Sequence, residues 1–461
     1  MKITDYHEIL PVIEHWVNYQ AFKNQIPGFS IGILHEDKII LNKQYGLADL
    51  NKKEKLRPDH LFLCASHSKM FTTTAIMQLH EAQKLDIYET VQKYLPWFQS
   101  PKDPILNKIT IFHLLTHTAG IVADKRLPNG RAPYNLDHLK EIVHHGISTH
   151  EPGQKIKYSN FAYSLLGAII EQISGLSYEK FIINNILEPL NMTRSVMGLT
   201  EKHIDQIASG YTLWYPDRKR EKINSYVSKT LDHIYTPVGG LLSTAEDLLK
   251  FWAAHFPGNE QLLSDSLKDE IIHNPVRIGK DYRAIGFEIT EFPGEKNFCQ
   301  IIGGTFGYRT QSGMLPEDKL AIAVLTNTTE SYIEKYSAGI INLLQVIQNR
   351  WKEFQNTSKE DGVHPDYHEL QQLYECPYGV HYFAQIGDKL TIFDMNADDP
   401  ASTLIILEDK GDNRFNSPKT LFFAKENEPF SFKKGEDGIM DLYDSLGRKM
   451  NRFSFDSYCR L

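Results

Sequence analysis

Ser66 and Lys69 are the two residues whose types and spacing most clearly suggest chemistry. They lie in the hexapeptide CASHSK (64–69), where a loop leads into an apolar segment with helical spacing. Residues three apart share one face of a helix, so the lysine amine is expected beside the serine hydroxyl. A serine hydroxyl becomes a nucleophile when a nearby base removes its proton. A lysine can be that base only in its neutral form, which requires burial or a neighbouring positive charge.

Tyr158 and Asn160 provide a second set of polar side chains at the start of another expected helix. They belong to the tripeptide YSN (158–160), which precedes an apolar run. Taken alone, the serine and lysine are typical of a helix cap beside a solvated lysine, and the tyrosine of an aromatic packed on the core.

With these two motifs the chain resembles the serine β-lactamase and penicillin-binding-protein superfamily. It is most similar to the class C β-lactamase-like branch of esterases, D-aminopeptidases and D,D-peptidases. The superfamily carries S-x-x-K as its first motif and Y-x-N as its second. The resemblance covers about residues 9–344, in the same order. Three further segments contribute to it, namely IPG at 26–28, LLTHTAG at 114–120 and PVGGLLST at 237–244.

The resemblance implies a role for each matching residue. Ser66 would be the nucleophile that forms an acyl-enzyme, and its backbone N–H would form half of the oxyanion hole. Lys69 and Tyr158 would share the proton transfers, and which of them is the base during acylation stays open. Asn160 would hydrogen-bond Lys69 or the substrate amide.

The third motif differs from the family pattern. Relatives place Lys-Thr-Gly, His-x-Gly or Trp-Gly-Gly on a strand beside the site, whereas this chain has IIGGTFGYR at 301–309. Gly303 and Gly304 allow close approach of the substrate, and an N–H near Gly304 or Thr305 would complete the oxyanion hole. Isoleucine replaces the cationic or imidazole group that would bind a substrate carboxylate. Arg309 is either a substitute cation or a solvated strand residue.

Two histidines and the cysteine near the motifs are expected to have structural roles or to lie in the core. His113 and His117 are four apart, as metal ligands would be, but no third ligand follows at metalloenzyme spacing. We therefore expect no metal and no organic cofactor. Cys64 is expected in the core, and His67 faces either the site or the core.

Composition narrows the class of protein and its partners. The chain has 461 residues, 41% hydrophobic and 23% charged, which is typical of a soluble globular protein and favours two domains. A net charge of −8 without a basic run argues against nucleic acid as a partner. No apolar run approaches the ~20 residues of a membrane span. The N-terminus lacks signal-peptide features, so we expect a cytoplasmic protein, with an exported form left open. A homo-oligomer is compatible with the sequence.

The first predicted domain, residues 1–350, is of the α+β class. The resemblance implies the β-lactamase/transpeptidase fold, in which helices flank an antiparallel sheet and a second subdomain is all helical. Periodicity predicts helices at 9–16, 68–85, 107–115, 160–173 and 244–252, a hairpin at 29–41, and a strand at 320–325 followed by a helix.

The second predicted domain, residues 366–461, follows a polar linker at 351–365. From 362 onward 17 acidic residues outnumber 11 basic ones, a sharp change in composition. Short apolar segments with turn residues between them predict a small all-β barrel, which resembles the lipocalin-like module found after such hydrolases. The expected strands lie at 389–393, 403–407, 420–424 and 430–433.

These observations predict a serine hydrolase that acts through an acyl-serine on short peptides, small amides or esters, including substrates with D-residues. Two alternatives stay open. One is a catalytically silent scaffold or penicillin-recognising protein, which the altered third motif favours. The other is a true class C β-lactamase.

Chelation tests the metal-free interpretation. EDTA is expected to leave hydrolysis unchanged, because serine, lysine and tyrosine need no metal for acyl transfer. The rate is measured before and after dialysis against the chelator. A loss of activity that zinc restores would contradict this prediction and support a role for the histidines.

Overall fold

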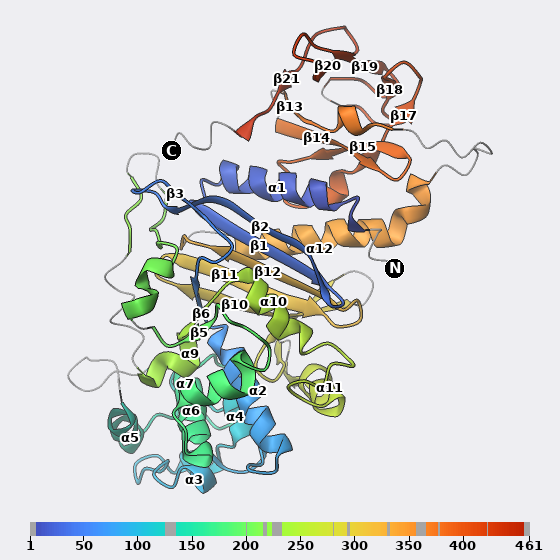
Figure 1. Ribbon diagram of the computed structural model, residues 1–461. Helices are drawn as coiled ribbons and strands as arrows, with labels where there is room; N and C mark the ends of the chain where they lie inside the picture. Colours follow the sequence, from blue (N-terminus) through green and yellow to red (C-terminus); the bar gives the residue numbers. More distant parts are fainter. Residues whose placement is uncertain are drawn as a thin grey trace. The chain divides into compact units, whose positions relative to one another are not determined.

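The computed structural model contains two compact units, and each is described by itself (Figure 1). One unit is Pro27–Ser331, and the other combines Met1–Ile26 with Tyr332–Leu461. The structure describes residues 6–124, 135–199, 201–214, 219–223, 233–279, 281–292, 296–329, 332–355, 366–376, 379–421 and 423–455. Most of the predicted linker, from 356 to 365, lies outside these ranges, so the domain boundary stays a prediction.

An antiparallel sheet of seven strands, in the order β3-β2-β1-β12-β11-β10-β9, is the main sheet of the first unit. Every residue of β1 is buried, as is every residue of β12. The predicted hairpin at 29–41 and the strand at 320–325 are both confirmed. The strand bounds are β1 Gly28–His35, β2 Lys38–Asp49, β3 Glu54–Lys55, β9 Glu288–Phe292, β10 Lys296–Thr305, β11 Tyr308–Leu315 and β12 Leu320–Thr326.

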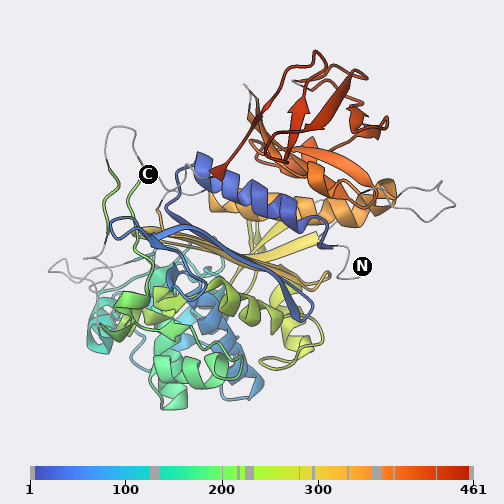
Figure 2. The ribbon, with the colours of Figure 1, turned by 45° about the horizontal axis from the view of Figure 1, so that its top comes forward.

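Helices of the same unit pack against this sheet and also gather into a helical group, as the fold prediction expects. Helix α10 (Ala245–Ala253) packs on β1 and β12. Figures 1 and 2 show the helical group, which contains α2 and α6, away from the sheet. The bounds are α2 Ser68–Glu81, α3 Val91–Tyr94, α4 Ile111–Leu115, α5 Leu136–His144, α6 Asn160–Ser174, α7 Tyr178–Ile182, α9 Thr236–Gly239 and α11 Asp265–His273.

Local sequence signals explain where these helices begin and end. Helix α6 starts after Ser159, whose hydroxyl accepts the N–H of Ala162, and ends at Gly175 with φ of 71°. The single helix predicted over 107–115 is wrong. The segment divides into a 3₁₀ turn at Pro104–Lys108 and helix α4, because Thr110 caps α4 by accepting the N–H of His113.

A second, three-stranded sheet of this unit has the order β4-β6-β5. Its first strand, β4, precedes the turn that leads into α2. Strand β4 (Phe62–Ala65) pairs with β6 (Leu241–Ser243), and β6 also pairs with β5 (Val196–Met197). Strand β4 leads directly into α2, and short helix α9 leads into β6. This arrangement places the loop before α2 beside the 236–240 segment.

The second unit contains α1 (Leu10–Lys23), α12 (Ile333–Arg350) and two small sheets. One sheet has the order β16-β15-β14-β13-β21 and the other β17-β18-β19-β20. Aromatic side chains such as Phe383, Phe415 and Phe432 form its core. The bounds are β13 Leu373–Cys376, β14 Gly379–Ile386, β15 Lys389–Asp394, β16 Ile405–Ile406, β17 Glu408–Asp409, β18 Arg414–Asn416, β19 Pro429–Lys434, β20 Met440–Tyr443 and β21 Asn451–Arg452.

These sheets confirm an all-β C-terminal region, but among the described strands they do not close into the predicted barrel. The chain passes from one sheet to the other at Leu407, between the two-residue strands β16 and β17. The strand expected at 420–424 is also wrong, because Leu421 and Ala424 pair with each other across a tight turn. That segment is apolar because Phe423 and Ala424 fill the core of the unit.

Among the residues that the structure describes, no helix combines the length and apolar character that crossing a bilayer requires. Within the same ranges, no group of three or more His, Cys, Asp or Glu side chains could hold a metal ion.

Gly167 of α6 tests the packing that supports the 236–240 segment. Alanine normally stabilises a helix by about 1 kcal/mol relative to glycine. Here, however, a Cβ at Gly167 would lie 2.2 Å from Cγ of Pro237. We expect Gly167→Ala to destabilise the protein by about 1–3 kcal/mol, measured by urea unfolding, because the overlap must be relieved by moving α6 or α9. Ala168→Gly is the control, because it removes one small buried methyl group and lowers helix propensity without creating an overlap. A stabilising Gly167→Ala would contradict this packing.

Candidate active site

Ser66 lies in the turn between β4 and α2. The preceding residue, Ala65, has φ of 48°, a left-handed conformation that is uncommon for a residue with a side chain. The backbone N–H of His67 donates to the Cys64 carbonyl at 3.2 Å and closes the turn. Such strained residues persist where the surroundings hold them, often at functional sites. The turn leaves Ser66 half-buried while its neighbours on both sides are buried.

Ser66, Lys69 and Tyr158 meet as the sequence predicts. Lys69 Nζ lies 3.2 Å from Ser66 Oγ, and Tyr158 OH lies 2.9 Å from the same oxygen. Lys69 also donates to the carbonyl oxygen of Val238 at 3.0 Å. The serine hydroxyl is therefore within proton-transfer distance of two groups at once.

Burial controls the charge of Lys69. Its side chain is 1% exposed, and this desolvation lowers its pKa to about 7. Among nearby charges, Asp124 acts to raise the pKa of Lys69 and Arg283 acts to lower it. A substantial fraction of the amine is therefore neutral at neutral pH and able to accept a proton.

Tyr158 has an aromatic and cationic environment. Burial raises the pKa of Tyr158, whereas its hydrogen bond to Ser66 and the charge of Arg283 act to lower it. The Lys69 amine lies 5.0 Å from the centre of the Tyr158 ring, and the His117 ring lies 4.5 Å from it. His117 accepts the backbone N–H of Ser159 at 3.1 Å, which fixes the start of α6. His117 therefore positions the tyrosine.

Asn160 contacts a different group from the one that the family resemblance implies. Its side-chain amide donates to the carboxylate of Asp124 at 3.2 Å. Asp124 is exposed, and its charge reaches Lys69 and Tyr158. The structure therefore pairs Asn160 with an exposed carboxylate.

The third-motif strand β10 passes close to the turn that carries Ser66. A Cβ at Gly303 would lie 2.1 Å from the Cys64 carbonyl oxygen, so only glycine permits this approach. Gly304 and Thr305 follow at the end of the strand. Ile301, on the same face as Gly303 by alternation, is 3% exposed. Strand β9 pairs with β10 only as far as Gln300, so residues 301–305 lie beyond its pairing.

Arg309 lies on the other face of the sheet. It pairs with Gly304 across β10 and β11, and a Cβ at Gly304 would lie 2.8 Å from its Nη1. Successive residues of a strand point to opposite faces, so Arg309 points away from the face on which Gly303 meets Cys64. The structure thus brings Ser66 and Gly303 into one region and places Arg309 outside it.

Cys64 and His67 belong to the core. Both are at most 1% exposed, and His67 Nδ1 lies 2.9 Å from the Cys64 carbonyl oxygen. Burial lowers the pKa of His67 to about 4 and raises that of the Cys64 thiol. A neutral imidazole and a protonated thiol fit the structural interpretation of these residues.

Sequence reasoning missed two charged residues of the site, Asp124 and Arg283. The guanidinium carbon of Arg283 lies 5.9 Å from the centre of the Tyr158 ring. No spacing rule links either residue to a motif, and each lies in a polar loop-like segment that is typical of a solvated surface. Only the fold brings Asp124 to Asn160 and Arg283 to Tyr158.

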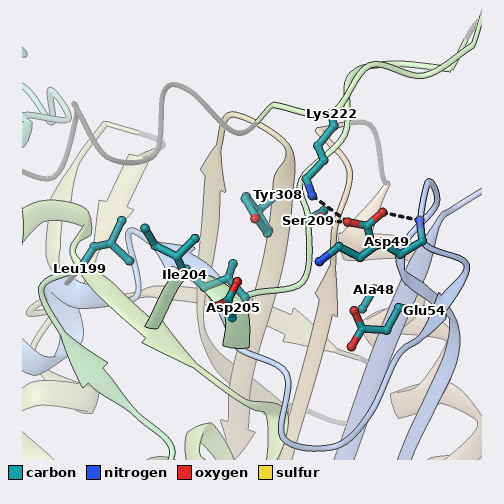
Figure 3. Close-up of a pocket in the computed structure, with 11 residues that line it drawn as sticks. Ala48, Asp49, Glu54, Leu199, Ile204, Asp205, Ser209, Lys222 and Tyr308 are labelled. Atoms are coloured by element: carbon teal, nitrogen blue, oxygen red, sulfur yellow. Dashed lines mark hydrogen bonds and ion pairs between the residues drawn. The ribbon is translucent and has the colours of Figure 1, made fainter. Parts of the chain in front are cut away.

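A cavity of about 300 Å³ opens near the turn between β10 and β11 (Figure 3). Asp49 lies in its wall, where it binds Lys222 at 2.7 Å and accepts from Ser209 at 3.1 Å. These contacts join Ser209 and Lys222 to the end of β2, and Tyr308 lines the same cavity. None of the predicted site residues lines it.

Comparisons with known proteins agree on one family. The family model described as Beta-lactamase matches residues 13–340. Protein flp of Staphylococcus aureus is 34% identical over 333 residues, 71% of this chain and 64% of that protein. The match thus spans less than two thirds of this relative. A penicillin-binding protein of Bacillus subtilis strain 168 is 29% identical over 329 residues, 67% of this chain and 69% of its own.

Solved structures share the fold. The octameric penicillin-binding protein homologue from Pyrococcus abyssi superposes with a TM-score of 0.63 at 20% identity, covering 96% of this chain and 99% of its own. The D-amino acid amidase from Ochrobactrum anthropi SV3 has a TM-score of 0.63 at 22% identity, covering 74% and 99%. At these identities the likeness establishes the fold alone.

Substitutions at the three central residues test the site. Ser66→Ala is expected to abolish hydrolysis of every substrate, because its hydroxyl is the only proposed nucleophile. Lys69→Ala and Tyr158→Phe should each reduce kcat/KM by at least ~10²-fold, the scale of lost acid–base catalysis. Steady-state kinetics on the best substrate measures both. Nearly full activity in Lys69→Ala would show that the serine–lysine assignment is wrong.

Proposed function

Because the chain belongs to the beta-lactamase family, we propose that it is a serine hydrolase that forms an acyl-enzyme on Ser66. The observation that carries this proposal is the contact of Ser66 Oγ with Lys69 Nζ at 3.2 Å and with Tyr158 OH at 2.9 Å. The pKa of Lys69, lowered to about 7 by burial, supports it further, because a neutral base then stands beside the nucleophile.

Acylation begins when neutral Lys69 takes the Ser66 proton as Oγ attacks the substrate carbonyl carbon. The carbonyl oxygen becomes an oxyanion, which the backbone N–H groups of Ser66 and Gly304 stabilise. Tyr158 relays the proton from Lys69 to the leaving group, so the carbon–nitrogen or carbon–oxygen bond breaks. Water then attacks the acyl-serine with the same groups in reversed roles, which releases the acid and restores the serine hydroxyl.

The substrates we propose are short peptides, small amides or esters, with D-residues among them. Ile301 provides no charge for a substrate carboxylate. Asp124 adds a carboxylate near Lys69 that suits a substrate ammonium group, such as a peptide N-terminus. Strand β9 pairs with β10 only as far as Gln300, so the backbone N–H and C=O groups of residues 301–305 on that edge lie beyond β9. We propose that an extended peptide substrate pairs with these groups.

A fluorophosphonate probe tests the proposed function. We expect it to label the wild-type chain and to fail on Ser66→Ala, with intact-protein mass spectrometry locating the adduct. A separate wild-type sample that has not been exposed to the probe is assayed with D- and L-aminoacyl p-nitroanilides, p-nitrophenyl esters and nitrocefin. An unlabelled wild type would favour the silent scaffold, and preferential turnover of nitrocefin would favour a β-lactamase.

The buried isoleucine of the third motif predicts a preference for neutral substrates. A charge-assisted hydrogen bond contributes roughly 1.5–3 kcal/mol, so its absence weakens selection for a carboxylate by about 10- to 150-fold. We expect kcat/KM of the wild type to be lower for nitrocefin than for p-nitrophenyl acetate or an aminoacyl anilide. Ile301→Lys and Ile301→His should shift this ratio toward nitrocefin.

Ile302→Lys is the matched control, because alternation places this residue on the opposite face of β10. It is expected to leave the ratio unchanged. Faster turnover of nitrocefin than of both neutral substrates by the wild type would contradict the predicted preference.

A further inference from the structure

Arg283 provides a positive charge at the proposed site from outside its three motifs. It ends β8 (Asp281–Arg283), which forms a two-stranded sheet with β7 (Val276–Ile278). Its side chain is 14% exposed, and its guanidinium carbon lies 5.9 Å from the centre of the Tyr158 ring. An arginine at this distance interacts favourably with an aromatic face and remains charged at every pH of interest.

Lys69 contacts the same ring, with Nζ at 5.0 Å from its centre. Because both distances start from one centroid, the two basic groups lie no more than about 11 Å apart, close to the Debye length of ~10 Å at 0.1 M salt. A like charge at this range, through buried protein, disfavours the charged form of the lysine. Arg283 therefore favours the neutral amine that acyl transfer requires.

The other charged and titratable groups around Lys69 have identifiable effects. Asp124 opposes Arg283 by favouring the lysine cation. His117 is neutral, since burial lowers its pKa well below the usual range. Tyr158 and Tyr163 present ring faces to the amine, with the Tyr163 ring centre 5.6 Å from Nζ. Among the described residues, the other polar groups that contact Nζ are the Ser66 hydroxyl and the Val238 carbonyl, which carry no charge.

Glu288 moderates the charge of Arg283. Its carboxylate accepts from Nη1 of Arg283 at 2.6 Å and is 40% exposed. Nε of Arg283 is buried and has no hydrogen-bond partner in the described structure. A buried donor left unpaired costs stability. Because the Arg283 guanidinium is held beside Tyr158 despite this unpaired donor, we infer that its positive charge has a role at the site.

We propose that Arg283 is a positioning residue on β8 that adds to the effect of burial and favours the neutral form of Lys69 at working pH. The inference rests on the proposed function, because it assigns Lys69 as the base. Arg283 acts through Lys69 and Tyr158 and needs no contact with the substrate.

Substitutions of Arg283 and Glu288 are expected to move the acidic limb of the pH profile in opposite directions. For a base that works when deprotonated, the acidic limb of kcat/KM follows the pKa of Lys69. Removing the nearby cation with Arg283→Met should move that limb up by about 1 pH unit, the Coulomb interaction at about 11 Å in an effective dielectric of about 20, and by less where Glu288 and salt screen the charge. Glu288→Gln leaves Arg283 uncompensated, so the limb should move down. Arg283→Lys retains the charge and should restore the wild-type limb.

Arg277→Met is the matched control. Arg277 is exposed on β7 of the same hairpin, so this variant removes one positive charge from the same small sheet, and the limb should not move. Equal shifts in Arg277→Met and Arg283→Met would contradict a specific role for Arg283. A limb that stays in place in Arg283→Met, or that moves down, would overturn the proposal.

A second readout separates this proposal from the proposed function. Protein labelled with [6-¹³C]lysine is titrated by NMR, and the Lys69 resonance is identified by its absence in Lys69→Arg. The midpoint should rise in folded Arg283→Met and return in Arg283→Lys, even if no substrate is turned over. A wild type inert toward every substrate and probe would refute only the proposed hydrolase. An unchanged midpoint in Arg283→Met would refute only the role of Arg283.

Discussion

The amine of Lys69 lies between the hydroxyl of Ser66 and the carbonyl oxygen of Val238, and the residue is only 1% exposed. A buried charge without a carboxylate partner is costly, so this environment favours the neutral form. In its neutral form the Lys69 amine can act as the base that the proposed function requires. The proposed chemistry therefore depends on the burial of this amine as well as on the local geometry of Ser66.

Three elements far apart in the sequence create this environment. Helix α2 presents Ser68 and Thr72 beside Lys69, and these hydroxyls contact the 237–241 segment at 2.9 and 2.8 Å. Helix α6 presses Gly167 against Pro237 of the same segment. The Val238 carbonyl thus lies at a fixed place above α2. The packing of the helical group and the geometry proposed for proton transfer therefore depend on the same 237–241 segment.

The sequence predicted those parts of the site that depend on local spacing. Ser66 and Lys69 share a helical turn, and Tyr158 directly precedes a strongly periodic helix, so their types and positions carried enough information. Arg283 and the carboxylate partner of Asn160 depend on tertiary contacts between distant loops, which periodicity does not encode. The turn at 420–424 was predicted as a strand for a similar reason: apolar residues fill a core in either conformation, and only the neighbouring strands decide between them.

The pH dependence of Ser66 phosphonylation tests the central claim, that a neutral Lys69 activates Ser66. The second-order rate constant with a fluorophosphonate is measured from about pH 5 to 10, with the adduct located by mass spectrometry. The account predicts a rise with a midpoint at about 7, the lowered pKa of Lys69, followed by a plateau. A rate that keeps rising toward pH ~10, where an ordinary lysine loses its proton, would contradict it.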